Sequence, residues 1–217
     1  MFEIFTKEGF LSFLYFLPAL LLSISIHEFG HAYVAYKLGD KSQKAQGRLT
    51  LSPIAHIDIV GFICIALFGI GWGKPVLVDD TYFKKRTRDN MFVALAGPMF
   101  NILLAILITI IFKILMVTGI VNYLEVREIG KILLTIIITT IQFNVMLAVF
   151  NLIPLPPFDG SKILYYFLPY KAKNFMVTLE KYSVYILLLL YITDAYTYII
   201  APAYSFISWL LNLILMI

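Results

Sequence analysis

The sequence predicts an all-α polytopic membrane protein with about five to six membrane segments, and three observations support this fold class. First, 61% of the 217 residues are hydrophobic and only 14% are charged, whereas soluble domains have about 45–50% apolar and about 25% charged residues. Second, the mean hydropathy is +0.89. Third, long apolar stretches recur along the chain. This apolar excess is too large for one buried core, so we expect most of the surface to face lipid.

Three apolar stretches are long enough to span a bilayer as helices, which takes about 20 residues. They cover approximately residues 10–36, 91–118 and 129–153. A fourth apolar region, residues 182–217, is interrupted by Asp194 and Pro202. We therefore expect either two further spans there, or one span and one interfacial segment.

Residues 57–71 form a shorter apolar stretch that contains Gly61 and Gly69. As a helix it would measure about 22 Å, less than the roughly 30 Å of a bilayer core. The stretch 72–78 that follows contains Gly, Pro and β-branched residues, which is typical of a short strand or loop. Non-helical backbone is stable at membrane depth only inside protein or beside a wet cavity. We therefore predict a re-entrant segment and a short membrane-embedded β-element near residues 57–80.

The distribution of basic residues favours this topology. If residues 57–71 do not cross, 12 of the 17 Lys and Arg residues lie on one side of the membrane, in the loops 37–56, 72–90 and 156–174. Loops rich in Lys and Arg stay in the cytoplasm, which places the N-terminus outside. No Arg-rich patch with interleaved aromatic residues is present, so we expect no nucleic-acid partner. Cys64 is the only cysteine, which excludes an internal disulfide.

Residues 27–31 read His27-Glu28-Phe29-Gly30-His31, the pattern H-E-x-x-H. On a helix the two histidines lie one turn apart on one face, so both imidazoles can reach a single metal ion. Glu28 is then placed to take a proton from a water molecule that the metal activates. Chance and a packed polar cluster are the alternatives. A Glu and two His in an apolar helix are costly in lipid without a partner such as a cation.

A catalytic zinc site needs a third protein ligand, and Asp159 is our candidate. It follows the third long apolar stretch in the run Asn151-Leu-Ile-Pro-Leu-Pro-Pro-Phe-Asp-Gly160. The prolines end the helix and leave an unwound segment that can bring a carboxylate inward. If residues 57–71 are re-entrant, Asp159 lies on the same side as the two histidines. The alternative interpretation of Asp159 is an ordinary turn residue at a helix end.

Three motifs, taken together and in order, resemble the site-2 protease family of intramembrane zinc metalloproteases. The first is His27 to His31 in an apolar helix. The second is Ala96 to Asn101, which is similar to the G-x-x-x-N stretch of the family. The third is Asn151 to Gly160, which matches the pattern N-x-x-P-x-P-x-x-D-G. The resemblance covers roughly residues 20–165 and is closest to the compact form of the family, without a PDZ or CBS domain.

The resemblance implies a set of site residues. One Zn²⁺ ion would be bound by His27, His31 and Asp159. Catalysis would depend on Glu28 as general base and on Asn151, which lines the site. Substrate contacts would come from Gly73, Lys74, Pro75, Val76 and Asn101. From the residues alone, Asn101 can instead pack helices together by hydrogen bonding.

The resemblance also implies a function and a location. Residues 1–217 would be a single transmembrane protease domain, with a catalytic core at about 10–165 and C-terminal spans at about 175–217. It would hydrolyse peptide bonds of transmembrane or signal-peptide-like substrates in the lipid bilayer, under the control of a regulatory membrane partner or of the terminal spans. The expected location is the plasma membrane of a prokaryote, with the active site toward the cytoplasm.

Two alternative functions are open at this stage. A membrane metallopeptidase of a separate type would use a downstream glutamate as third ligand, but no Glu lies within a later apolar helix. A non-catalytic zinc-binding scaffold or transporter is the other alternative. A transporter would be expected to show repeated broken helices, and the sequence shows no internal repeat.

Overall fold

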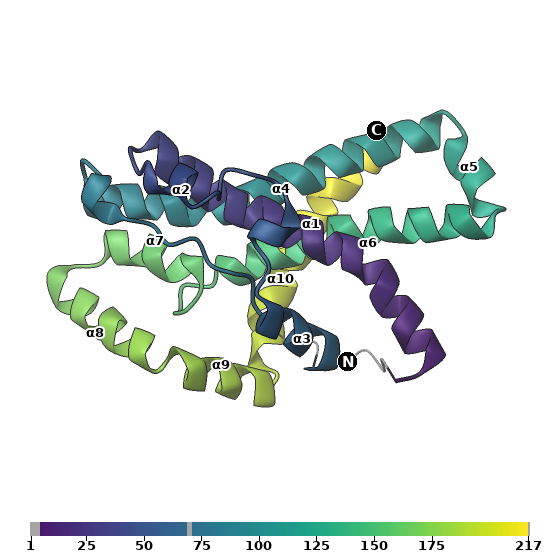
Figure 1. Cartoon of the computed structure of the whole chain (residues 1–217). Coiled ribbons are helices and arrows are strands. Elements are labelled where there is room, and N and C mark those ends of the chain that lie inside the picture. Colours follow the sequence, from purple (N-terminus) through teal and green to yellow (C-terminus); the bar gives the residue numbers. More distant parts are fainter. Residues whose placement is uncertain (1–4, 69–70, 217) are drawn as a thin grey trace.

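The computed structural model describes residues 5–68 and 71–216, and this part of the chain is helical with connecting loops (Figure 1). The prediction of an all-α membrane protein is confirmed. The helices are α1 (Lys7–Lys37), α2 (Ser42–Ala45), η1 (Pro53–Ala55), α3 (Ile59–Phe68), η2 (Asp80–Tyr82), α4 (Arg86–Val117), α5 (Ile120–Glu125), α6 (Glu128–Asn151), α7 (Asp159–Phe167), α8 (Tyr170–Lys181), α9 (Ser183–Ile192) and α10 (Ala195–Met216).

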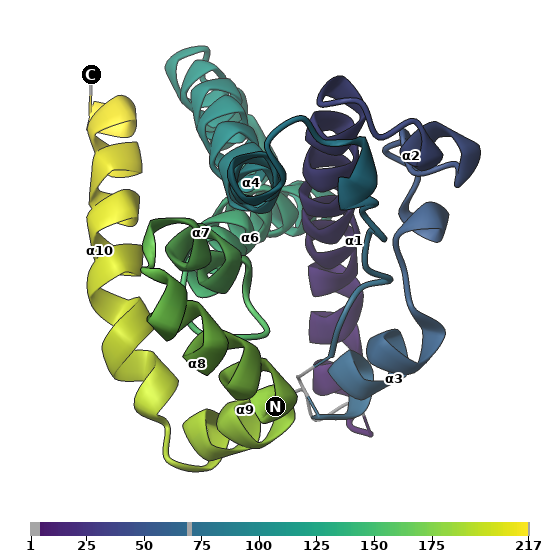
Figure 2. The same ribbon diagram turned by 90° about the vertical axis from the view of Figure 1, so that its left-hand side faces the viewer.

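The core is formed by α1, α4 and α6, each of which packs against the other two (Figure 2). The short helix α7 packs on α4, and α10 lies along α4 and α6. Buried apolar side chains fill these contacts, among them Ala105, Val145, Val149 and Leu211. The helices α8 and α9 lead away from the core to α10, and α8 packs against α7 and α9 alone among the main helix contacts.

Three helices in the described part are long and apolar enough to cross a membrane, namely α1, α4 and α6. The pair α8 and α9 would make a fourth span, although it is bent by 69° at the break. The helix α3 has only ten residues, and the apolar part of α10, Ile200–Met216, is also short for a span. The structure therefore supports three to four spans, and the further segments of the predicted five to six stay a prediction.

The stretch expected to be re-entrant ends next to where it begins, and Ile65 of α3 packs with Phe13 and Leu20 of α1. Ile57 and Gly73 form an isolated antiparallel bridge, and the Lys74 N–H donates to the His56 carbonyl at 2.8 Å. Residues 56 and 74 therefore lie together, at the same end of the intervening helix α3. Gly69, one of the two glycines expected within this stretch, lies outside the described residues.

The predicted β-element is smaller in the structure than expected. Within residues 5–68 and 71–216 no strand forms, and the Ile57–Gly73 bridge is isolated. The reason is that Pro75 has no N–H to donate. In addition, side chains already donate to the carbonyls of Lys74, Pro75 and Leu77. Residues 74–79, which we call the 74–79 segment, therefore lie in no strand and no helix.

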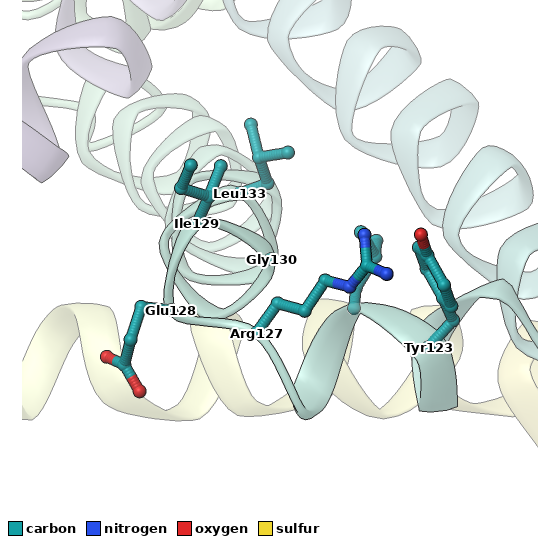
Figure 3. A pocket seen from close by; sticks show the side chains of 7 residues that line it. Tyr123, Arg127, Glu128, Ile129, Gly130 and Leu133 are labelled. Carbon is teal, nitrogen blue, oxygen red and sulfur yellow. The ribbon is translucent and has the colours of Figure 1, made fainter.

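A cavity of about 390 Å³ lies at the corner between α5 and α6 (Figure 3). Its lining is mostly apolar, and the Arg127 guanidinium lies 3.8 Å from the centroid of the Tyr123 ring. This corner follows the C-terminal end of α4. The H-E-x-x-H motif of α1 instead contacts the N-terminal half of α4. None of the residues predicted to form the site lines this cavity.

Candidate metal centre

The two histidines of the H-E-x-x-H motif lie on successive turns of α1 and face the core. His27 and His31 are 6% and 8% exposed. Their Nε2 atoms are 3.1 Å apart. The four-residue spacing on an unbroken helix produces this arrangement, because residues i and i+4 share one face.

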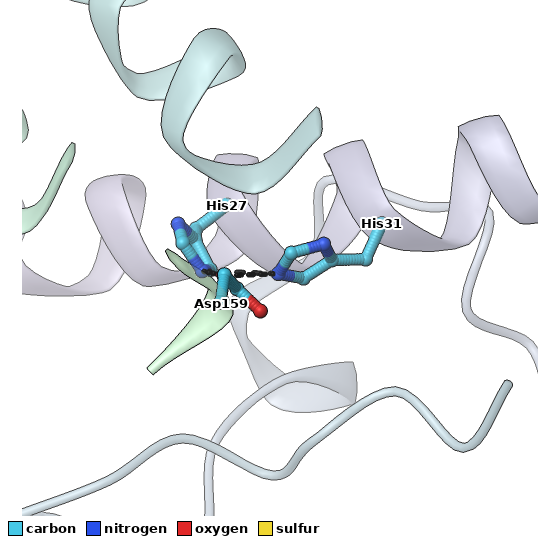
Figure 4. Close-up of side chains that lie close together, drawn as sticks. All are labelled: His27, His31 and Asp159. Carbon is cyan, nitrogen blue, oxygen red and sulfur yellow. Dashed lines mark hydrogen bonds and ion pairs between the residues drawn. The ribbon is translucent and has the colours of Figure 1, made fainter. Parts of the chain in front are cut away.

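Asp159 joins the two histidines from α7 (Figure 4). It is the first residue of that helix and follows a segment that contains three prolines, so the chain enters the core just before α7 begins. Its Oδ2 atom lies 3.2 Å from His27 Nε2 and 3.1 Å from His31 Nε2. The structure thus brings together the three residues that the sequence argument required to meet.

The tautomer of His31 follows from its second nitrogen. His31 Nδ1 lies 2.7 Å from the carbonyl oxygen of Val93 on α4. A carbonyl oxygen can only accept a hydrogen bond, so Nδ1 carries the hydrogen and donates. In the neutral ring, Nε2 then carries no hydrogen, and its lone pair is directed at His27 and Asp159.

The tautomer of His27 can be deduced from the hydrogen bonds of Asn101, which is fully buried on α4. The Asn101 Nδ2 group donates to the Ser23 carbonyl at 3.0 Å and to Asn144 Oδ1 at 2.7 Å. The Ser23 carbonyl can only accept, so the amide of Asn101 must direct Oδ1 at His27. His27 Nδ1 lies 2.7 Å from that oxygen and donates to it. The Nε2 atom of His27 is therefore also free to bind a metal.

Three lone pairs thus converge on one point inside the core. Asp159 Oδ2 is buried and has no hydrogen-bond donor among the described residues, a costly arrangement unless a cation is bound. Tetrahedral zinc at 2.0–2.2 Å from each ligand requires ligand atoms about 3.3 Å apart. The observed separations of 3.1–3.2 Å match that requirement. Two imidazoles and one carboxylate, with the fourth position open, are a donor set typical of catalytic zinc.

Two glycines allow α4 to approach this cluster closely. A Cβ atom built on Gly97 would lie 2.5 Å from Cε1 and Nε2 of His31 and 2.7 Å from Cε1 of His27. A Cβ atom on Gly30 would lie 2.9 Å from the Ala96 carbonyl oxygen. Real side chains do not tolerate such contacts, so Gly30 and Gly97 are required for the hydrogen bonds from the histidines to α4.

The predicted general base, Glu28, lies beside the 74–79 segment. Its Oε2 atom accepts a hydrogen bond of 3.0 Å from the Val76 N–H. A Cβ atom on Gly73 would lie 3.8 Å from Glu28 Oε1 and 2.9 Å from Ile24 Cγ2, so this position has little room for a side chain. The structure therefore brings the predicted substrate-binding stretch, Gly73 to Val76, next to Glu28.

The remaining contacts of the predicted site residues are those of Asn151, Asn101 and the second oxygen of Asp159. The described hydrogen bond of Asn151, the last residue of α6, is from its Nδ2 group to the Leu147 carbonyl at 2.9 Å. Asn101 is enclosed behind His27, which favours orienting that ring over contacting substrate. The second oxygen of Asp159, Oδ1, lies 4.0 Å from the exposed Lys162 ammonium.

Several residues important to the site were not found from the sequence. The Val93 carbonyl accepts from His31, and Ser23 and Asn144 accept from Asn101, which holds His27. Long-range hydrogen bonds of this kind leave no local sequence pattern. His56 turns out to cap η1, and its Nε2 atom lies 2.8 Å from the Thr50 carbonyl oxygen. His56 therefore has a structural role in this turn.

The fold and the site together define a class, a polytopic membrane protein whose helical core contains a His-His-Asp cluster that could hold a metal ion. A family model described as "Peptidase family M50" matches residues 15–193. The chain belongs to this family, the site-2 protease family, and is a zinc metalloprotease. The resemblance read from the three motifs is thereby confirmed.

Relatives with this chemistry in their names come from bacteria and archaea. "Putative zinc metalloprotease YwhC" of Bacillus subtilis is 37% identical over 87% of this chain and 84% of the relative. "Putative zinc metalloprotease MJ0611" of Methanocaldococcus jannaschii is 33% identical over 74% of this chain and 75% of the relative. "Putative zinc metalloprotease Rip2" of Mycobacterium tuberculosis is 28% identical over 79% and 64% of the two chains. No solved structure matches the chain significantly.

Proposed function

We propose that this zinc metalloprotease hydrolyses peptide bonds of transmembrane substrates inside the bilayer. In this proposal one zinc ion is held by His27, His31 and Asp159, and Glu28 is the general base. The observation that carries the proposal is the convergence of three unprotonated ligand atoms, 3.1–3.2 Å apart, between helices that are long and apolar enough to span a membrane.

The depth of the cluster supports an intramembrane reaction. His27 bonds to Asn101, which lies at the middle of the 32-residue helix α4. A spanning helix of this length exceeds the thickness of the hydrocarbon core, so its middle lies within that core. A peptide bond that reaches the cluster at this depth belongs to a chain that is itself in the membrane.

The chain's own residues supply the remaining chemistry. When bound, zinc supplies Lewis-acid chemistry, which polarises a peptide carbonyl and lowers the pKa of water. Glu28 takes a proton from the attacking water and passes it to the leaving amine. Asn151 has a second N–H beside the one that donates to Leu147, and this N–H is free to stabilise an oxyanion. The extended stretch Gly73 to Val76 offers backbone groups to a locally unwound substrate.

The path of the chain supports a cytoplasmic site. Because residues 56 and 74 lie together, the basic loops on either side of α3 are on one side of the membrane. The exposed Lys162 next to Asp159 belongs to the same basic set. The positive-inside rule assigns this side to the cytoplasm. The plasma membrane of a prokaryote is the proposed location, with transmembrane or signal-peptide-like segments as substrates.

The test compares Glu28→Gln with Glu8→Gln, an exposed control in the first turn of α1. Both purified proteins should retain about one zinc per chain. Cleavage of a membrane-spanning peptide should fall about 10²–10⁴-fold in Glu28→Gln and stay at the wild-type level in Glu8→Gln. Wild-type cleavage by Glu28→Gln would remove Glu28 from this role. Equal rates on a soluble peptide with the same scissile sequence would contradict an intramembrane substrate.

A further inference from the structure

The 74–79 segment is held by three buried polar side chains from α2 and the loops on either side of it. The Arg48 guanidinium, 5% exposed, donates to the carbonyls of Lys74 at 3.2 Å and Pro75 at 3.0 Å. Gln43 Nε2 donates to the Leu77 carbonyl at 2.8 Å. Asp40 Oδ2 accepts from Gln43 Nε2 at 2.7 Å and from the Asp79 N–H at 3.0 Å. We call Asp40, Gln43 and Arg48 the clip.

A buried arginine that bonds only to carbonyls is an unusual arrangement. Arg48 also donates to the Ala55 carbonyl at 2.6 Å, and no described carboxylate forms an ion pair with it. Burying a charge without a counter-ion is costly. Its planar group bridges residue 55 to residues 74 and 75, which one flexible ammonium cannot do. This bridge fixes the chain immediately before Val76.

The residue that the clip brackets is Val76, whose N–H donates to Glu28 at 3.0 Å. Arg48 holds the two carbonyls before Val76, and Gln43 holds the carbonyl after it. The backbone on both sides of this amide is therefore fixed by buried donors. A hydrogen bond to a carboxylate is charge-assisted and stronger than one between neutral groups.

We propose that the clip, through the Val76 N–H, positions the Glu28 carboxylate for proton transfer. Val76 and Arg48 are positioning residues in this arrangement, and the proposal rests on the general-base role proposed above for Glu28. A glutamate has three side-chain torsions, and small misplacements of a reacting group lower rates strongly. The contact restricts one carboxylate oxygen and leaves the other available to water.

The first experiment removes the N–H of Val76 with the substitution Val76→Pro. Proline has no N–H and therefore eliminates the donor, and Val76 lies outside any helix. The matched control is Leu77→Pro, because the Leu77 N–H donates to no described acceptor. With a membrane-spanning peptide as substrate, Val76→Pro should lower kcat about 10- to 100-fold with zinc content unchanged. Leu77→Pro should leave kcat within about twofold, because it keeps the Val76 N–H that donates to Glu28.

The second experiment tests whether Arg48 acts through the same contact. Arg48→Met should lower kcat about 10-fold, and Arg48→Lys should recover only part of this loss. The double variant Arg48→Met with Val76→Pro should be no slower than Val76→Pro alone, because both remove one interaction. Hydrogen exchange of the Val76 amide should be slow in the wild type and faster in Arg48→Met.

Two outcomes separate this inference from the proposed function. If Glu28→Gln abolishes cleavage while Val76→Pro and Leu77→Pro have the same kcat, the positioning role is wrong and the general base stands. Additive effects of Arg48→Met and Val76→Pro, with unchanged exchange at Val76, would likewise overturn the positioning role. If Glu28→Gln cleaves normally, the proposed function itself fails.

Discussion

The cluster of His27, His31 and Asp159 and the 74–79 segment both contact α1, but they are held in different ways. Each imidazole of the cluster bonds to a buried group of α4, and close packing of two long helices maintains those bonds. The 74–79 segment is held by side chains of the loop between α1 and α3, and Lys74, Pro75 and Leu77 are exposed. The ligand geometry therefore depends on the whole helical core, whereas the neighbour of Glu28 depends on a few side-chain bonds.

The largest effect expected on the cluster comes from Asp159→Ala. It removes the only carboxylate from a set of three ligands, and two imidazoles alone are a poor zinc site. Zinc measured on purified protein should fall from about one per chain to near zero, and cleavage should be lost. The control is Lys162→Gln, which changes the exposed cation 4.0 Å from Asp159 Oδ1 and should retain zinc. Full zinc content in Asp159→Ala would exclude Asp159 as a ligand.

A smaller effect is expected from Asn101→Ala, which leaves the ligands intact but frees the His27 ring. Loss of a hydrogen-bond partner behind a metal-binding histidine typically costs 10–100-fold in metal affinity or activity. We expect that loss of zinc affinity in a competition titration. Asn144→Ala should lose less zinc affinity, because Asn144 acts on His27 only through Asn101. The exposed Asn122→Ala is the matched control. Equal affinities for all three variants would show that helix packing alone orients the ring.

The smallest effect concerns the clip and pH. Burial raises the pKa of the Asp40 carboxyl, but hydrogen bonds from Ser42, the Asp79 N–H and Gln43 lower it, and the net shift is downward. A lowered pKa in the folded state means that the charged carboxylate contributes stability above the ordinary value of 3.8. This contribution is lost as the pH falls through the lowered value. The protection of the Asp79 amide against hydrogen exchange, relative to an unfolded amide at the same pH, should therefore fall only in acid, and Asp40→Asn should abolish this fall in protection.

The sequence was a good guide where chemistry and local geometry coincide. The spacing of His27 and His31 on one helix face could be read directly, and the prolines before Asp159 indicated an unwound entry to the core. The long apolar stretches located α1, α4 and α6, and most of the ends of these helices were predicted to within a few residues. These features depend on neighbours in sequence, so a single chain is enough to predict them.

The remainder depends on contacts between distant residues. Nothing local indicates that Asn144 holds Asn101, or that Arg48 reaches the carbonyls of Lys74 and Pro75. The β-branched residues of the 74–79 segment favoured a β-element, but its backbone groups are used by side chains instead. Those side chains come from a loop whose polar residues could equally have faced solvent.

The position of Asp159 has a consequence for how the enzyme is made. The first two proposed ligands are synthesised early, but the proposed third ligand follows α4 and α6, after about three quarters of the chain. In the proposed site, a nascent chain that has inserted only α1 and α4 would have two of the three ligands and could not assemble the centre. The proposal therefore implies that the protease would gain activity only when α7 docks on α4.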